Sequence, residues 1–199
     1  MARYEPLEIE YKIATTFALA MMVSGFNYEL SSPEYAMKIV TALNDMEIEA
    51  ERMLDLPSLV FMLPSFMNEE TEPMITQVIE QISATWFVVM RDRLDLLTVS
   101  TFALGWARGN MYNQDLLEQM ADQVLKKHKE GIFFEEGSES EVSNILNGIS
   151  QLGYRNEELS EALYEMLVGE EFKTNGEIAE QYDFFTLYTI VSAFARIHP

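Results

Sequence analysis

The residue types that carry out most enzyme chemistry are scarce in this sequence of 199 residues. It has no cysteine, which excludes cysteine nucleophiles, disulfides and thiolate metal sites. The two histidines, His128 and His198, belong to no His-x-x-x-His or Glu-x-x-His pair, and no Gly-rich phosphate-binding loop occurs. The 33 acidic residues leave a paired-carboxylate site open, although so many carboxylates lie near one another without any catalytic role. We therefore expect a protein that is not an enzyme, with no catalytic residue, no metal site and no cofactor.

The basic residues that could contact a nucleic acid gather in two short segments. They are Arg91, Arg93, Lys126, Lys127 and Lys129, with His128 inside the second segment. One interpretation is an RNA-contact patch. The other is that the second segment is the solvated C-terminal end of a helix, where cations suit the helix dipole, or a docking point for an acidic partner.

The overall charge argues against nucleic acids and anionic membranes as partners. The sequence has 33 Asp and Glu against 13 Lys and Arg, which gives a formal net charge of -20. Phosphate backbones and anionic lipid headgroups are both bound largely through Lys and Arg. A simpler interpretation of the same charge is that it keeps a chain with 48% hydrophobic residues in solution.

No segment has the length and composition of a membrane span. The most apolar one, Ile13 to Phe26, is shorter than the roughly 20 apolar residues that a span requires, and it follows Glu8 and Glu10. It also lacks the preceding basic region of a signal peptide. No Arg- and Ser-rich transit peptide is recognisable, so we expect that such a peptide was removed or never existed.

Apolar residues recur with helical spacing along nearly the whole chain, which predicts an all-α protein. Several starts carry capping residues, such as Asn113 and Asn156, which precede acids that favour the positive end of the helix dipole. We expect nine helices, near residues 8–26, 33–52, 57–67, 72–90, 93–109, 114–129, 140–152, 157–168 and 183–197.

The pattern of apolar residues repeats along the chain. At a shift of 43 positions, Val99 matches Val142, Trp106 matches Ile149 and Leu116 matches Leu159. A shift of 45 takes Val142, Ile145, Ile149 and Leu152 onto Leu187, Ile190, Phe194 and Ile197, and a shift of 40 takes Leu59, Met62 and Phe66 onto Val99, Phe102 and Trp106. Two helices per period of about 40–45 residues predict a short α-solenoid of stacked helical hairpins. The alternative is an irregular helical bundle with coincidental spacing.

We expect one domain over residues 1–199. Its hairpins would span residues 8–52, 57–90, 93–129 and 140–168, followed by a half repeat at 183–197. The polar segments Glu135 to Glu141 and Gly169 to Glu180 are predicted to be solvated loops between hairpins.

One repeat carries a family resemblance. Gln151 to Leu163 reads QLGYRNEELSEAL and follows a helix that ends in NILNGIS. An apolar helix ending in Leu-Gly-Tyr, then a polar turn and a second helix beginning with acids, resembles the repeats of organellar octotricopeptide, heptatricopeptide and FAST-kinase-like proteins, which are related in architecture to pentatricopeptide repeats. The resemblance is best over residues 93–199. It implies an organellar location, most often the mitochondrion, and a role in RNA metabolism or in a large organellar assembly.

The last helix is the strongest candidate for a contact surface. Asp183 to Pro199 would form only the first helix of a further hairpin, yet this segment is apolar around most of its circumference. An exposed apolar strip usually marks a contact surface. The predicted partner-binding residues are Phe184, Phe185, Tyr188, Val191, Phe194 and Ile197. A protein partner or a second copy of the chain would cover them, unless the acidic segment before them folds back over this face.

The aromatic side chains have two interpretations. Trp86, Phe87, Trp106 and Tyr112 are residue types that stack on bases. However, Trp106 matches Ile149 and Phe66 in the neighbouring repeats, which places it in the core. Trp86 and Phe87 belong to a run that is apolar on all sides, so we expect them to be buried or at an interface.

These observations favour a non-enzymatic helical-repeat scaffold or accessory subunit that contacts other proteins in a larger assembly. The resemblance places that assembly in the mitochondrion, and without it the expected location is the cytoplasm. The alternative function is an RNA-binding repeat protein in organellar RNA processing or translation.

Overall fold

The computed structural model describes residues 56–69, 71–89, 91–132, 139–175 and 183–197. The two predicted helices at 8–26 and 33–52 lie outside these ranges. Every regular element within them is helical, as the sequence predicts, and seven are α-helices. These are α3 (Leu56–Met62), α4 (Glu72–Val89), α5 (Leu96–Arg108), α6 (Gln114–Lys129), α8 (Glu139–Gln151), α9 (Glu157–Asn175) and α11 (Phe184–Ile197), with short 3-10 helices η2 (Leu63–Phe66) and η3 (Arg91–Arg93).

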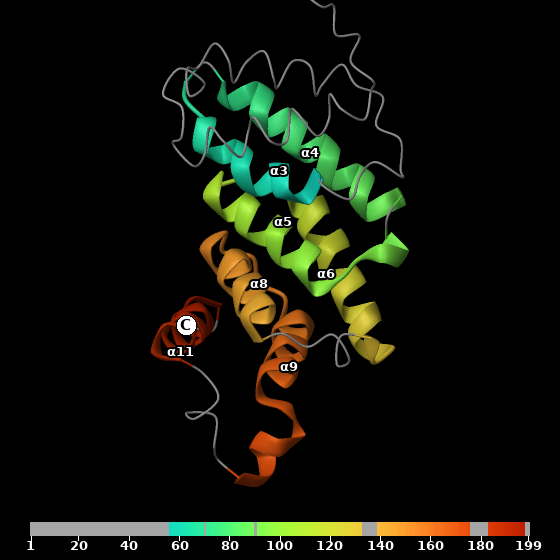
Figure 1. Cartoon of the computed structure of the whole chain (residues 1–199), viewed down its shortest axis with the longest axis vertical. Helices are drawn as coiled ribbons and strands as arrows, with labels where there is room; N and C mark the ends of the chain where they lie inside the picture. Colours follow the sequence, from blue (N-terminus) through green and yellow to red (C-terminus); the bar gives the residue numbers. More distant parts are fainter. Residues whose placement is uncertain (1–55, 70, 90, 133–138, 176–182, 198–199) are drawn as a thin grey trace, which may run out of the picture.

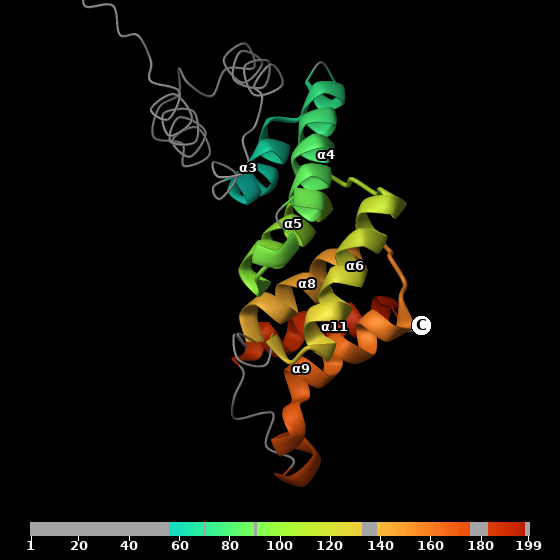
Figure 2. The same ribbon diagram turned by 90° about the vertical axis from the view of Figure 1, so that its right-hand side faces the viewer.

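The helices form two adjacent rows along the long axis of the molecule (Figures 1 and 2). In the first row α3 packs on α5, α5 on α8 and α8 on α11. In the second row α4 packs on α6 and α6 on α9. The last helix, α11, therefore lies at one end of the first row, next to α8.

The turns that end α5 and α8 have the same backbone geometry. One residue of each turn is left-handed, Asn110 with φ 49° and Gly153 with φ 70°. Its N–H donates to the carbonyl three residues earlier, and the next N–H donates to the carbonyl five residues earlier, which is the Schellman arrangement. These hydrogen bonds join Asn110 to Ala107 (3.1 Å), Met111 to Trp106 (2.9 Å), Gly153 to Ser150 (3.1 Å) and Tyr154 to Ile149 (3.0 Å).

The helices that follow these turns begin in the same way. The side-chain oxygen of Asn113 accepts from the Leu116 N–H at 3.2 Å, and that of Asn156 accepts from the Leu159 N–H at 2.9 Å. Each bond satisfies one of the N–H groups that a helix start leaves without a partner. Both caps were predicted from the sequence, and they lie 43 positions apart, as do the two left-handed residues.

Two glycines bring consecutive helices of the first row into backbone contact. A Cβ atom added at Gly105 of α5 would lie 2.6 Å from the carbonyl oxygen of Val60 in α3. A Cβ atom added at Gly148 of α8 would lie 2.6 Å from the carbonyl oxygen of Ala103 in α5. Gly148 follows Gly105, and Ala103 follows Val60, by the same 43 positions. The α3–α5 and α5–α8 crossings therefore use equivalent residues.

The aromatic residues of the core join the two rows. Phe87 of α4 lies against Phe102 and Trp106 of α5, with ring centroids 5.3 and 5.9 Å apart, and Trp86 lies edge-on to Phe102 at 6.1 Å. The indole N–H of Trp106 donates to the Ser83 hydroxyl at 3.0 Å. Trp86, Phe87 and Trp106 are all buried, which confirms the prediction that these rings belong to the interior rather than to a base-stacking surface.

Two predicted helix ends are wrong. The helix predicted to end at 168 continues to Asn175, so the first part of the predicted loop Gly169 to Glu180 is helical. One glycine costs a helix only about 1 kcal/mol relative to alanine, and no proline occurs between Gly169 and Asn175. The helix predicted to begin at 93 begins at Leu96, because the Asp95 side chain accepts from the Thr98 N–H at 2.7 Å and caps it there.

Candidate protein-binding surface

The helix α11 begins with a capped first turn and packs against α8. Asp183 precedes the helix and accepts from the Thr186 N–H at 2.9 Å and from the Thr186 hydroxyl at 3.1 Å. The backbone hydrogen bond from Thr186 is the main reason why the pKa of Asp183 is lowered from its ordinary value. On the side toward α8, Ala193 and Ile197 are buried. The helix is therefore capped at its start and anchored near its end.

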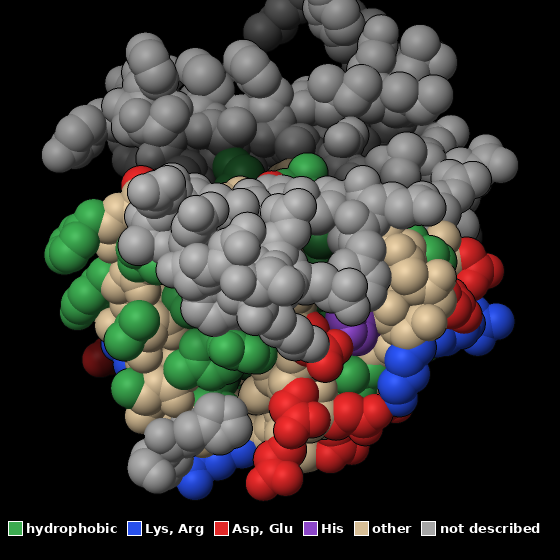
Figure 3. All heavy atoms as spheres, turned by 90° about the horizontal axis from the view of Figure 1, so that it is seen from below, with side chains coloured by type: hydrophobic (Ala, Val, Ile, Leu, Met, Phe, Trp, Pro, Cys, Tyr) green, Lys and Arg blue, Asp and Glu red, His purple; other side chains and the backbone are tan. Residues whose placement is uncertain are grey.

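The opposite side of α11 carries a continuous set of exposed hydrophobic side chains, which we call the outer stripe. It consists of Phe184, Phe185, Tyr188 and Val191, which are 84%, 76%, 62% and 66% exposed. These residues follow helical spacing and so share one side of the helix. In Figure 3, hydrophobic side chains gather at the left edge, where α11 lies. A contiguous apolar surface of this kind is characteristic of an interaction site.

The six predicted partner-binding residues divide into two groups. The four residues of the outer stripe are exposed, as described above. Phe194 is half-buried, and its ring lies edge-on to that of Tyr164 in α9, with centroids 5.8 Å apart. Ile197 is buried. Phe194 and Ile197 therefore face the interior of the protein, because they continue the side of α11 that packs against the rest of the chain.

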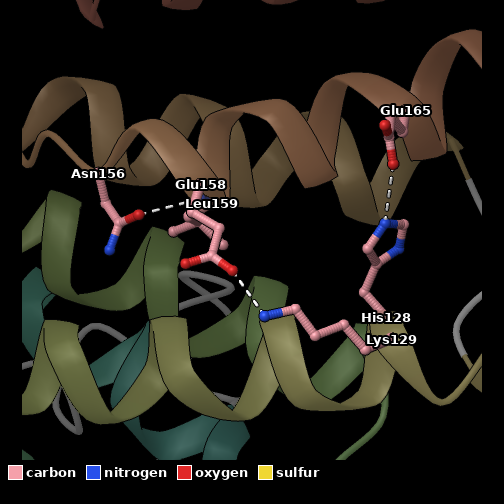
Figure 4. A network of polar contacts seen from close by, with 6 residues as sticks. All are labelled: His128, Lys129, Asn156, Glu158, Leu159 and Glu165. Atoms are coloured by element: carbon pink, nitrogen blue, oxygen red, sulfur yellow. Dashed lines mark hydrogen bonds and ion pairs between the residues drawn. The ribbon is translucent and has the colours of Figure 1, made fainter.

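The basic run at the end of α6 is largely engaged within the protein. The ammonium group of Lys127 is buried and donates to the carbonyl oxygen of Leu94. That of Lys129 lies 2.6 Å from a carboxylate oxygen of Glu158, and Nε2 of His128 lies 3.2 Å from a carboxylate oxygen of Glu165 (Figure 4). Figure 4 shows both contacts crossing from α6 to α9, with the contact between Lys129 and Glu158 nearer to the Asn156 cap. The run therefore joins α6 to α9.

Arg91 and Arg93 flank Asp92 in η3, which lies beside the end of α6, because Nζ of Lys127 is 3.5 Å from the carbonyl oxygen of Asp92. Lys126 is exposed and lies 4.0 Å from Glu130 in the last turn of α6. Arg91 is exposed and its Nε lies 3.9 Å from a carboxylate oxygen of its neighbour Asp92. Arg93 ends η3, and its side chain is not among those that the structure describes.

The other exposed large hydrophobic residues are scattered over α4, α5, the turn before α6, and α9, where Tyr164 is 47% exposed. Val88 ends the buried run of α4 and is 67% exposed, while Leu97 in the first turn of α5 is 61% exposed. Tyr112, considered above for base stacking, is also exposed and donates its hydroxyl proton to the Gln114 side chain. The run around Val88 is apolar on all sides in the sequence, and its pattern does not distinguish the buried Trp86 and Phe87 from the exposed Val88.

No cluster of three or more His, Asp and Glu side chains suited to a metal ion occurs among the described residues. Among the same residues, no helix is both long and apolar enough to cross a membrane.

Comparison of the chain with protein-family models, with curated proteins and with solved structures finds no match. The functional proposal therefore depends on the geometry of the chain itself and on the repeat resemblance.

Proposed function

We propose that this chain is a short α-solenoid that acts as a non-enzymatic scaffold or accessory subunit, and that it binds a protein partner through the outer stripe of α11. The observation behind this proposal is the exposure of Phe184, Phe185, Tyr188 and Val191 on one side of one helix. Burying a side chain of this type contributes roughly 1.5–3 kcal/mol. Four such side chains supply enough free energy for a specific contact even after the entropy cost of association.

The solenoid part of the proposal is supported by the recurrence of equivalent contacts along the first row. The crossings at Gly105 and Gly148, the left-handed turn residues and the asparagine caps all recur at the same interval of 43 positions. In a stacked-hairpin protein each repeat contacts mainly its neighbours, so equivalent residues make equivalent contacts. An irregular bundle has no physical reason to repeat them.

RNA binding is the less favoured function because of where the basic residues lie. Of the run on α6, Lys127 is buried, and His128 and Lys129 contact Glu165 and Glu158 of α9. An RNA backbone would have to compete with these carboxylates and with a net charge of -20. The mitochondrial location depends on the repeat resemblance alone and is part of the same proposal.

The test is affinity capture of the tagged chain from its native cell extract, with and without nuclease, followed by mass spectrometry. We expect a stoichiometric set of proteins that survives nuclease treatment. The double variant Tyr188→Glu/Val191→Glu should lose this set while the protein remains helical by circular dichroism. The matched control Val88→Glu/Leu97→Glu also replaces two exposed hydrophobic residues with Glu, but on α4 and α5, and should retain the set.

Two outcomes contradict the proposal. Associations that disappear with nuclease would support the RNA-binding alternative. A capture that is equally strong for both double variants would show that the outer stripe does not bind the partner.

A further inference from the structure

The first two crossings of the first row share one packing feature. At the α3–α5 and α5–α8 crossings, we call the helix that comes earlier in the sequence the receiving helix and the later one the incoming helix. The incoming helix places a glycine against the backbone of the receiving helix, where a Cβ atom would lie 2.6 Å from a carbonyl oxygen. Real Cβ atoms essentially never approach a carbonyl oxygen this closely. The receiving residues are Val60 and Ala103, and the incoming ones are Gly105 and Gly148. A helix that adds to this row therefore needs a very small residue where it crosses.

The repeat register extends the set of receiving residues along the row. Leu146 of α8 follows Ala103 by 43 positions, and Val191 of α11 follows Leu146 by 45, the two shifts found for the surrounding apolar residues. Leu146 is fully buried in the row, whereas Val191 is 66% exposed. The same register takes the buried Ser143 of α8 to Tyr188, which is 62% exposed. Tyr188 and Val191 of the outer stripe thus occupy positions equivalent to buried positions of α8, the preceding helix of the row.

A second copy of the chain is a less favourable occupant than a basic protein. The four residues of the outer stripe are large, and Ala193, which corresponds in register to Gly148, is fully buried. The one small residue exposed on the side of Val191 is Ala195, one turn farther along α11. Two copies, each with a formal net charge of -20, would also repel each other.

The overall charge of the chain indicates the sign of the partner. On α11 itself, the exposed Asp183 at the start and the exposed Arg196 in the last turn offset each other. The whole-chain charge of -20 favours the approach of a basic protein and disfavours that of an acidic one.

We propose that the outer stripe receives a helix from a basic protein partner, and that this helix carries Gly or Ala where it crosses Val191. The inference rests on the proposed function, because it names the kind of segment that the protein-binding surface accepts. In effect the partner supplies the next helix of the first row.

The chain itself offers a probe of suitable sequence. The helix α5, Leu96–Arg108, crosses the receiving residue Val60 through Gly105, and Val191 has the same side chain as Val60. A labelled synthetic peptide of the α5 sequence with a short lysine tail is titrated with the full-length protein, and binding is followed by fluorescence anisotropy. Two matched peptides carry Gly105→Leu or replace the lysine tail with glutamates.

We expect the glycine peptide to bind and the Gly105→Leu peptide to bind at least about tenfold more weakly, which corresponds to about 1.4 kcal/mol of overpacking at the crossing. Because Leu favours helix formation more than Gly does, differences in peptide helicity would act in the opposite direction. The glutamate-tailed peptide should also bind more weakly. The protein variant Val191→Asp should lose binding, and Leu97→Asp, which changes an exposed hydrophobic residue elsewhere, should keep it.

Several results would overturn the proposal. Equal or tighter binding of the Gly105→Leu peptide would remove the requirement for a small residue, and failure of all three peptides to bind at millimolar concentration would remove the receiving site. A dimer in sedimentation equilibrium that Val191→Asp converts to monomer would make a second copy the occupant.

The peptide assay and the capture assay test the proposed function and the requirement for a small residue separately. If capture depends on Tyr188 and Val191 but the peptides show no preference for glycine, the proposed function stands and this inference fails. If the glycine preference is found but capture is unaffected by the stripe variants, the proposed function fails.

Discussion

Gly148→Ala is the substitution that most directly tests the close contact between α5 and α8. In an open helix interior, replacing Gly with Ala stabilises a protein by about 1 kcal/mol through helix propensity. Here the new Cβ atom would lie 2.6 Å from the carbonyl oxygen and 2.7 Å from the carbonyl carbon of Ala103. These are backbone atoms that cannot rotate aside, so α8 must shift away from α5. Overpacking of this kind costs about 1–3 kcal/mol, so after the propensity gain of about 1 kcal/mol we expect a net loss of up to about 2 kcal/mol.

The free energy of unfolding is measured by urea denaturation followed by far-UV circular dichroism, with Tm from a thermal scan. For a chain of this size the expected loss lowers Tm by about 2–4 °C per kcal/mol. Gly105→Ala meets Val60 in the same way and should destabilise the protein to a similar extent. Glu161→Ala, at an exposed position of α9, is the control and should change stability by less than about 0.5 kcal/mol.

A gain of about 1 kcal/mol in Gly148→Ala would refute the reasoning. The higher helix propensity of alanine would then be the only effect of the substitution, and the backbones of α5 and α8 would be farther apart than the structure places them. The requirement for a small residue on the incoming helix would lose its basis at the same time.

Three further predictions concern the contacts that hold the hairpins together. Asn156→Ala removes the cap of α9 and should cost about 1 kcal/mol in urea unfolding, whereas Asn156→Asp, which retains an acceptor, should cost less. Lys127→Met leaves the Leu94 carbonyl without this buried donor and should cost about 1–3 kcal/mol, whereas Lys126→Met at an exposed site should be nearly neutral; equal effects would contradict the burial of Lys127. Burial, with a smaller contribution from the Glu118 and Asp122 carboxylates, raises the pKa of Tyr154 above its ordinary value of 10.0. The unfolded state therefore releases this proton at a lower pH than the folded state does, so the stability that Tyr154 contributes is fully present below pH 10 and is lost above it. Between pH 9 and pH 11, the free energy of unfolding should decrease less in Tyr154→Phe than in the wild type.

The sequence predicted the elements whose signals are local. Asn113 and Asn156 were recognised as helix starts because a side chain that accepts a backbone N–H is followed by acids, and both form the expected caps. The burial of Trp106 followed from comparison with Ile149 in the next repeat. Local hydrogen-bonding chemistry and the period of the apolar residues were sufficient for these predictions.

Features that depend on the surrounding structure were not predictable in the same way. Helical spacing from Met120 and Val124 puts Lys127 on the core side of α6. Only the structure shows the carbonyl oxygen of Leu94 that accepts from its ammonium group there. The end of α9 was predicted too early because the acidic and polar segment that begins at Gly169 was assigned to a loop, although a solvated helix end has the same composition.

The difference between Leu146 and Val191 shows why the candidate surface needed a structure. Both are branched apolar residues on helices of similar pattern, and the repeat register makes them equivalent. Leu146 is fully buried on α8, which packs against α5 and α11, whereas Val191 is 66% exposed. Sequence pattern therefore identifies which residues of a row helix face its neighbours, while burial depends on whether a neighbour packs there. For the same reason the six residues predicted on α11 divide, with Ile197 directed toward the protein and Val191 toward solvent. A helix that retains an apolar receiving position at the end of the described row is suited to continue that row with a helix from another protein.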